Sequence, residues 1–212
     1  MNKKLVVITS IIILLPILVS LCFWNQLPEQ VPIHWNIHGE IDGYASRFVA
    51  VIVLPLVLFV LHFVCAFATM MDPKHKNISD KIWMLILSIC PVLSILLMYM
   101  MVGSALGMEI DVNAILPVFL GVMFVVIGNY LPKCKQSYTV GIKIPWTLNS
   151  EENWNKTHRF AGPCWLIGGI MVMFTGLFEN EILLFVIALA MVFVPVIYSY
   201  MYYVKYEKDK EE

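Results

Sequence analysis

Charged side chains are scarce in this sequence. Only 14% of the 212 residues are Asp, Glu, Lys or Arg, whereas soluble domains carry about 25%. Six intervals of at least 19 residues contain no charge: Leu5–Pro28, Phe48–Met71, Ile82–Met108, Val112–Pro132, Phe160–Phe178 and Ile182–Val204. A helix needs about 20 apolar residues to cross the hydrocarbon core of a bilayer. We therefore predict an all-α integral membrane protein with six transmembrane helices and exclude a soluble fold.

The charge-free intervals also lack most of the side chains that ion-coupled pumps and intramembrane proteases use. His62 is the only conventional titratable residue deep within a predicted span. Ion-coupled pumps and intramembrane proteases need buried carboxylates, paired histidines or a metal site, so their absence argues against both classes. His62 remains either a functional group or a hydrogen-bond partner of a neighbouring helix. The five cysteines include no CxxC motif, and we expect no disulfide framework.

Basic residues predict the orientation of the chain. If the N-terminus is inside, thirteen of the fourteen Lys and Arg lie in cytoplasmic segments, and only Arg47 lies outside. The positive-inside rule therefore predicts that the N- and C-termini are both cytoplasmic. The first interval is longer than the apolar region of a signal peptide, and no small-x-small cleavage site follows it, so we interpret it as a retained helix. The net charge of −1 gives no indication of nucleic-acid binding.

The first external loop, residues 25–46, has the pattern of a strand. Apolar and polar residues alternate along it: Ile33, Trp35 and Ile37 on one face, and His34, Asn36 and His38 on the other. This period of two predicts a short extended element, with turn signals at Gly39 and at the pair Asp42-Gly43. Strand positions four apart lie roughly 13 Å from each other, so His34 and His38 could share a metal with Glu40 and Asp42 only if the chain bends. We expect no metal; a structured loop and a ligand-recognition surface both stay open.

The large cytoplasmic loop, residues 133–160, combines an extended stretch with a helix start. Residues 140–146 read as extended, and Asn149 is placed to cap a helix with Glu152 as its capping-box partner. Glu152 and Lys156 are spaced for an ion pair, and Trp154 and His158 share one helical face. We expect Trp146 and Trp154 to anchor this segment at the lipid headgroups. It reads as an interfacial connector or as a binding surface.

Catalysis is not indicated. Thr157, His158 and Glu152 offer a hydroxyl, an imidazole and a carboxylate, but no motif connects them, and we expect no enzyme and no cofactor. The chain is expected to divide into residues 1–71 (a helix pair with its external loop), 72–132 (a middle helix pair) and 133–212 (the cytoplasmic loop and the last two helices).

Two motifs resemble known families. Residues 141–162 read GIKIPWTL and then SEENWNKTHRFAG, which closely resembles the signature of the SdpI family of bacterial immunity proteins. Residues 27–43 read LPEQVPIHWNIHGEIDG and resemble a small N-terminal domain that is often fused to that family. Lys143 stands where Arg is more usual, which keeps the charge but weakens bidentate contacts.

The resemblance implies a multi-pass protein of the bacterial plasma membrane that protects its cell from a secreted, membrane-active toxin peptide. It further implies a receptor that holds a soluble transcriptional repressor at the inner membrane face, without direct nucleic-acid binding. Expected partners are therefore the lipid bilayer, the toxin peptide and the repressor. The external recognition residues are expected to be Pro32, His34, Trp35, Asn36, Gly39, Asp42 and Gly43. The cytoplasmic ones are expected to be Gly141, Lys143, Pro145, Trp146, Thr147, Leu148, Glu152, Trp154, Thr157, His158 and Arg159. The alternative is a small-solute transporter or channel, for which the spans offer only isolated polar residues.

Overall fold

A computed structural model describes residues 2–178 and 181–208 of the chain. The chain folds into two compact units: unit 1 comprises Met1–Met70 and Asp80–Val112, and unit 2 comprises Met71–Ser79 and Asn113–Glu212. Residues 209–212, with Lys210 of the orientation argument, lie outside the described residues. The three-segment division remains a prediction from the sequence.

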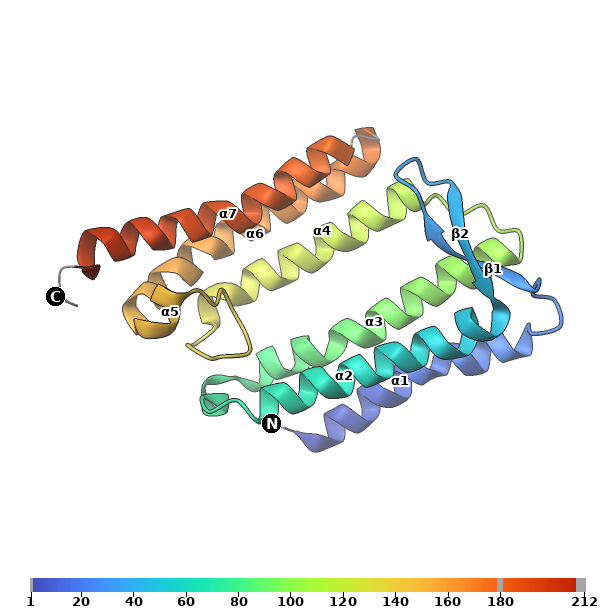
Figure 1. The fold of residues 1–212 in the computed structure, drawn as a ribbon, viewed down its shortest axis with the longest axis horizontal. Helices are drawn as coiled ribbons and strands as arrows, with labels where there is room; N and C mark the ends of the chain where they lie inside the picture. Colours follow the sequence, from blue (N-terminus) through green and yellow to red (C-terminus); the bar gives the residue numbers. More distant parts are fainter. Residues whose placement is uncertain (1, 179–180, 209–212) are drawn as a thin grey trace. The chain divides into compact units, whose positions relative to one another are not determined.

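Unit 1 is a bundle of three helices. It contains α1 (Lys3–Cys22), a π-helical turn (Val49–Val53) that runs into α2 (Leu54–Met70), and α3 (Asp80–Ala105); the three helices lie side by side (Figure 1). Few polar contacts join them. The Ser94 hydroxyl donates to the Ile13 carbonyl at 2.8 Å, and Nε2 of His62 lies 3.0 Å from the Thr9 hydroxyl. His62 therefore hydrogen-bonds a neighbouring helix.

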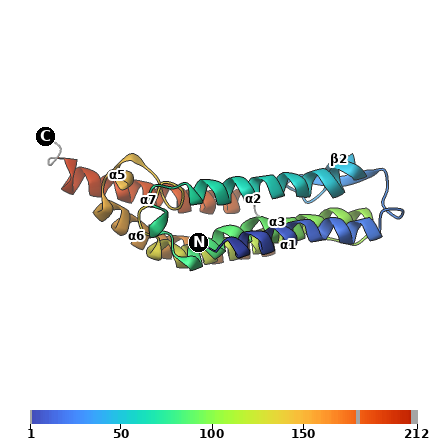
Figure 2. The ribbon, with the colours of Figure 1, turned by 90° about the horizontal axis from the view of Figure 1, so that it is seen from below.

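A β-hairpin lies at one end of unit 1 (Figures 1 and 2). Strands β1 (Gln30–Trp35) and β2 (Ile41–Ser46) pair antiparallel, which confirms the extended element. Val31 belongs to a buried cluster with residues of the π-helical turn and of α3, and Trp35 packs against it. Two details of the expected pattern are wrong. Ile37 lies beyond β1 and is 65% exposed, and Asp42-Gly43 lies within β2 rather than at a turn, because the turn is formed by residues 36–40.

Unit 2 is built on three long helices, α4 (Val112–Tyr130), α6 (Glu151–Phe178) and α7 (Glu181–Tyr206). Short helical turns at His75–Asn77 (η2) and Leu131–Lys133 (η3) and the short helix α5 (Pro145–Asn149) complete it. α6 and α7 run alongside each other (Figure 1). The Trp165 indole donates to the Met191 carbonyl at 2.8 Å, and the rings of Phe160 and Tyr198 stack with centroids 4.3 Å apart.

Glycines let α4 and α6 approach at backbone distance. A Cβ on Gly121 would lie 2.5 Å from the Gly169 carbonyl oxygen, and one on Gly169 would lie 2.7 Å from the Gly121 oxygen. About two turns further along α4, a Cβ on Gly128 would lie 2.7 Å from the Leu166 nitrogen. Small residues at such crossings are typical of helix packing in membranes, where close van der Waals contact replaces the hydrophobic driving force.

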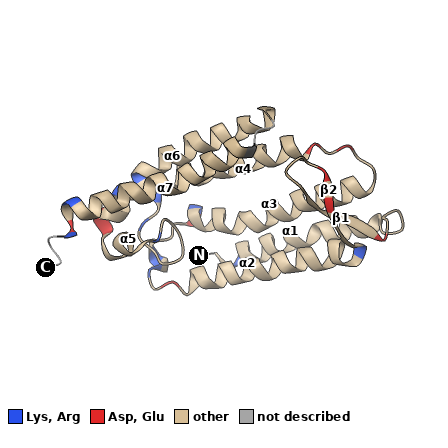
Figure 3. Cartoon of the chain, turned by 45° about the horizontal axis from the view of Figure 1, so that its top comes forward, with Lys and Arg blue, Asp and Glu red and all other residues tan. Residues whose placement is uncertain are grey.

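Six described helices are long and apolar enough to cross a membrane: Lys3–Cys22, Val49–Met70, Asp80–Ala105, Val112–Lys133, Glu151–Phe178 and Ile182–Tyr206. Charged residues leave their central stretches almost empty (Figure 3). This confirms the prediction of six apolar helices and makes the chain a multi-pass membrane protein. The orientation of the termini remains a prediction.

Candidate functional site

The hairpin presents a His–carboxylate pair on its outer face. Nδ1 of His34 lies 2.5 Å from Oδ1 of Asp42, and the two side chains are 68% and 44% exposed. His34 stands opposite Gly43 across the ladder, where a Cβ would lie 2.8 Å from the His34 Cβ. Gly43 therefore makes room for His34, and the pair faces solvent without further covering.

Asn36 organises the hairpin turn. Its side-chain oxygen accepts from the backbone N–H groups of His38 at 2.9 Å and Glu40 at 3.0 Å, and its amide nitrogen donates to the Glu40 carboxylate at 3.0 Å. Gly39 completes the turn with φ of 75°, a conformation that favours glycine. Within the described ranges, no group of three or more His, Cys, Asp and Glu is arranged to hold a metal ion.

The other predicted hairpin residues serve packing. Pro32 is buried and Trp35 is half-buried against the cluster below the hairpin. Arg47 was not predicted as a site residue, yet it fastens the hairpin to the end of α1. Its guanidinium donates to the Trp24 carbonyl at 3.2 Å and lies 5.2 Å from the centre of the Trp24 ring. The sequence offered one signal: Arg47 is the one basic residue that the predicted orientation places outside.

In unit 2, residues 134–144, here called the motif loop, close over a stacked pair of rings. The Trp154 indole and the His158 imidazole stack with centroids 4.1 Å apart. Nδ1 of His158 donates to the Trp154 carbonyl at 2.8 Å, and Nε2 accepts the Ile142 N–H at 2.9 Å. The Trp154 indole donates to the Cys134 carbonyl at 2.8 Å. Two side chains of α6 therefore hold the loop at both of its ends.

Gly141 lies directly on this pair. Its φ is 118°, and a Cβ would lie 2.5 Å from Nε2 of His158 and 2.7 Å from the Trp154 ring. Both the backbone conformation and the lack of space require glycine. The expected shared face of Trp154 and His158 is confirmed, but Trp154 is fully buried, so its expected role as a headgroup anchor is wrong.

Thr147 fixes the step from the loop into α5. Its hydroxyl lies 2.8 Å from the Ile142 carbonyl and 2.9 Å from the Ile144 carbonyl, and it accepts the Ile144 N–H at 3.1 Å. Pro145 is the first residue of α5, where its missing N–H costs no hydrogen bond. The extended stretch therefore ends at Ile144, one residue before the helix.

α6 begins with Ser150 as its cap rather than with Asn149. The Ser150 hydroxyl accepts the Asn153 N–H at 3.1 Å and bonds the Glu207 carboxylate near the end of α7. Asn149 belongs to α5, because the short helix occupies the residues that were expected to be extended or capping. Glu152 accepts from the Tyr202 hydroxyl at 2.5 Å instead of forming the expected ion pair with Lys156.

A buried amide joins α6 to α7. The Asn153 oxygen accepts from Thr157 at 3.0 Å and from the Ser199 hydroxyl at 2.6 Å, and its nitrogen donates to the Ser199 carbonyl at 3.2 Å. The same nitrogen donates to the Glu207 carboxylate at 3.0 Å. Thr157 therefore hydrogen-bonds within the protein. Asn153, which was not among the predicted site residues, is the centre of this hydrogen-bond network.

Asp72 holds the start of the motif loop. Its carboxylate accepts the Tyr138 and Thr139 N–H groups, each at 2.9 Å, the Thr139 hydroxyl at 2.7 Å and the Lys74 N–H at 2.7 Å. Burial by itself raises the pKa of this carboxyl, but the hydrogen bonds from Thr139, Lys74 and Tyr138 outweigh burial, and the pKa lies below its ordinary value. Sequence reasoning missed Asp72, since 66 residues separate it from its partner Tyr138.

Gln136 makes the second bridge across the loop. Its amide nitrogen donates to the carbonyls of Thr147 at 2.8 Å and Leu148 at 2.9 Å, and its carbonyl oxygen accepts from the Lys74 ammonium. Asn77 donates to the Gln136 backbone carbonyl at 2.8 Å. The segment 71–79 and the motif loop are thereby one hydrogen-bonded structure within unit 2.

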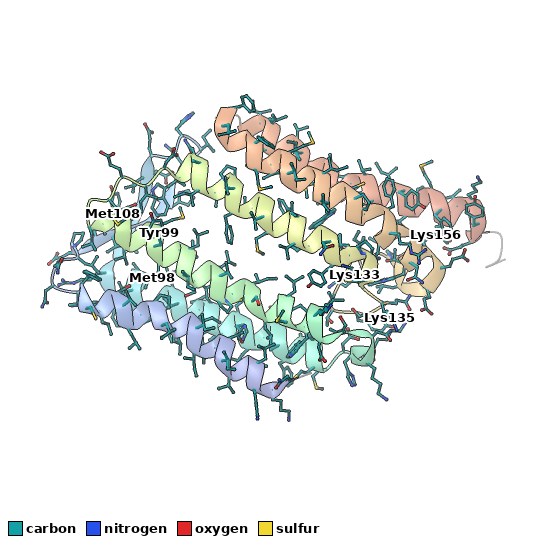
Figure 4. The ribbon with its side chains drawn as sticks, turned by 180° about the vertical axis from the view of Figure 1, so that it is seen from behind. Met98, Tyr99, Met108, Lys133, Lys135 and Lys156 are labelled. Atoms are coloured by element: carbon teal, nitrogen blue, oxygen red, sulfur yellow. The ribbon has the colours of Figure 1, made fainter. Side chains whose placement is uncertain are left out.

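Several exposed members of the motif are charged. Lys143 donates to the Thr139 carbonyl at 3.2 Å, and Arg159 lies on the exposed face of α6. Lys133, Lys135 and Lys156 lie at the same end of unit 2 (Figure 4). These side chains, rather than Trp154 or His158, are available to a partner or to headgroups.

His158 and Cys134 are both held in unreactive forms by their surroundings. Both ring nitrogens of His158 are engaged, so His158 is held as the neutral tautomer with its proton on Nδ1. Burial raises the pKa of the nearby Cys134 thiol to about 11, which keeps it protonated and unreactive near neutral pH. In this arrangement His158 supplies no free base and Cys134 no thiolate nucleophile.

Comparison with known proteins agrees with both motifs. The model of the SdpI/YfhL protein family matches residues 133–199, and that of a domain of unknown function, DUF1648, matches residues 11–59. The immunity protein SdpI of Bacillus subtilis (strain 168) is 25% identical over 208 residues, which cover 94% of this chain and 96% of that protein. No solved structure matches significantly. The chain is thus a distant homologue of that immunity protein over nearly its full length, and it belongs to the SdpI/YfhL family with an N-terminal DUF1648.

Proposed function

We propose that this chain is an immunity protein that protects a bacterial cell from a secreted, membrane-active toxin peptide. The observation that carries the proposal is the relationship to an immunity protein over 94% of the chain, with both domains in place. The engagement of both ring nitrogens of His158 supports a binding role over a catalytic one.

In this proposal the chain lies in the plasma membrane with both termini in the cytoplasm. The hairpin of unit 1 then faces outward and the motif loop of unit 2 faces the cytoplasm. The distribution of Lys and Arg supports this orientation. A cysteine placed at His38 would then react with an impermeant maleimide in intact cells, and one at Lys135 only after permeabilisation. The reverse labelling pattern would contradict the orientation.

The hairpin is the proposed site of toxin recognition. Its exposed face carries the hydrogen-bonded pair of His34 and Asp42, whereas its other face packs against the buried cluster around Val31. Exposed ion pairs contribute about 1 kcal/mol or less to stability. Changing His34 and Asp42 is therefore expected to alter recognition without unfolding the protein.

The motif loop is the proposed docking site for a soluble transcriptional repressor. The segment 71–79 connects α2 to α3 of unit 1 through the chain, and its Asp72, Lys74 and Asn77 hydrogen-bond the motif loop in unit 2. A toxin that favours one arrangement of the unit 1 helices would thereby bias the motif loop as well. This route supports a receptor role.

Survival of sensitive cells tests the function. Cells expressing the chain are challenged with a sporulation-delaying-type toxin peptide while their membrane potential is followed. We expect the potential to be retained with the intact protein and lost with the double change His34→Ala and Asp42→Ala. Glu29→Gln, an exposed change on the same loop, is the control and should protect fully. Depolarisation despite confirmed insertion of the intact protein would contradict the proposed immunity.

A further inference from the structure

A pocket of about 500 Å³ opens at the end of unit 2 that carries α5. Its lining includes Trp146 of α5, Tyr203 of α7, Glu207 directly after α7, and Ser150 and Glu152 at the start of α6. Trp146 belongs to the same family motif as Trp154. The motif therefore does more than hold the motif loop over the Trp154 ring. It also builds one wall of a cavity.

The walls of the pocket combine aromatic faces with carboxylates. The rings of Trp146 and Tyr203 are stacked, with centroids 6.1 Å apart and planes inclined by 23°, and Tyr200 lies against Trp146 at 5.3 Å. Glu207 is held by Ser150 and by Asn153 at 3.0 Å, and Glu152 by Tyr202 at 2.5 Å. The neutral donors Ser150, Asn153 and Tyr202 orient the carboxylates without neutralising them.

Within the described part of the chain, neither carboxylate forms an ion pair. Among residues 2–178 and 181–208, no Lys, Arg or His nitrogen lies within 4.0 Å of a carboxylate oxygen of Glu152 or Glu207. A pair of negative charges beside aromatic faces favours an organic cation, since the faces of Trp and Tyr attract ammonium and guanidinium groups. A partly enclosed cavity strengthens this attraction, because bulk water screens it less.

We propose that this pocket binds a basic side chain, the ammonium of Lys or the guanidinium of Arg, carried by a soluble protein partner. The inference deepens the proposed function, since it names the chemistry by which a cytoplasmic partner would dock on the motif. A zwitterionic lipid headgroup fits less well. It carries a phosphate beside its amine, and the two carboxylates repel that phosphate, whereas a Lys or Arg side chain has a neutral stem.

The pocket can be tested on the purified full-length chain in phosphatidylcholine nanodiscs. The probe is the tripeptide acetyl-Gly-Arg-Gly-amide, and its counterpart with citrulline in place of Arg is the matched uncharged control. The chain is labelled with 5-fluorotryptophan, and the fluorine resonance of residue 146 is assigned by its loss in Trp146→Phe. We expect a saturable shift of this resonance with the Arg peptide and at least tenfold weaker binding of the citrulline peptide.

Substitutions locate the binding. Glu152→Gln and Glu207→Gln each remove one pocket charge. Each is expected to lower the affinity for the Arg peptide at least threefold, and the double variant is expected to lower it further. Glu151→Gln removes the same charge from the neighbouring exposed position, which does not line the pocket, and should bind as the parent does. Thermal unfolding of each variant shows whether the fold is kept, and Glu152→Gln remains informative if Glu207→Gln destabilises the end of α7.

Two outcomes would overturn the proposal: equal binding of the Arg and citrulline peptides, or no saturable shift at all. A shift of the same resonance on replacing phosphatidylcholine with phosphatidylethanolamine, without a response to the peptide, would assign the pocket to a lipid amine instead. Peptide binding is measured without toxin or cells. A failure of toxin protection therefore leaves this result standing, and a failure of peptide binding leaves immunity untouched.

Discussion

The imidazole of His158 lies under the indole of Trp154, with ring centroids 4.1 Å apart, planes inclined by 19°, and both imidazole nitrogens hydrogen-bonded to backbone groups. The two most conspicuous side chains of the SdpI-type motif are therefore internal. They hold the loop in one conformation, and the residues around it, such as Trp146 and Lys143, are the ones left to meet a partner.

His158→Ala is expected to lower the free energy of unfolding by about 2–4 kcal/mol. The change leaves the partly buried Ile142 N–H without an acceptor and opens a cavity beneath Trp154. Thermal and denaturant unfolding in detergent measure the loss. Arg159→Ala, at the exposed neighbouring position, should leave stability unchanged. An unaltered His158→Ala protein would show that the loop is not held by this ring.

Gly141→Ala should destabilise the protein more than Gly107→Ala does. Both glycines have positive φ, 118° and 83°, so both substitutions strain the backbone by about 1–2 kcal/mol. Only at Gly141 would the added Cβ also meet His158 and Trp154, whereas nothing lies within 4 Å at Gly107. Comparison of the two unfolding midpoints isolates the steric part. Equal losses would contradict the close packing of the loop on the ring pair.

Acid is expected to weaken the attachment of the motif loop through Asp72. Its pKa in the folded protein lies below the ordinary value of 3.8, so its stabilisation is fully present above that value and is lost as the pH falls through the lowered pKa. Asp72→Asn should reduce stability near neutral pH and flatten the dependence below about pH 4. Unfolding midpoints measured from pH 7 to pH 3 test this, with the exposed Glu29→Gln as control. An unchanged pH profile in Asp72→Asn would refute the assignment.

Gly169→Leu should separate α4 from α6. Its Cβ would lie 2.7 Å from the Gly121 carbonyl oxygen, a backbone atom that cannot rotate away. We expect a loss of several kcal/mol or failure to accumulate as folded protein, since overpacking forces the helices apart. Ala190→Leu, at an exposed position of α7, is the matched control and should be tolerated. Size-exclusion profiles and unfolding midpoints in detergent distinguish the two variants.

The linear sequence predicted the features that depend on local composition. Charge-free intervals such as Phe48–Met71 predicted the membrane helices, because charge is excluded from hydrocarbon wherever the rest of the chain lies. Alternation before Gly39 predicted the first strand, and the spacing of Trp154 and His158 predicted their shared face. The two motifs, read as they stand, predicted the family.

Tertiary structure alone decided which motif residues are internal and what they touch. The sequence places Trp154 among polar residues, which favoured an interfacial anchor, yet the loop from 134 to 144 folds back over it. Asp72 and Glu207 lie far along the chain from their hydrogen-bond partners, so no local sequence pattern predicts these contacts. Helix propensity and hydropathy act over a few neighbouring residues, whereas hydrogen bonds such as those of Asp72 depend on backbone groups that only the folded chain brings together.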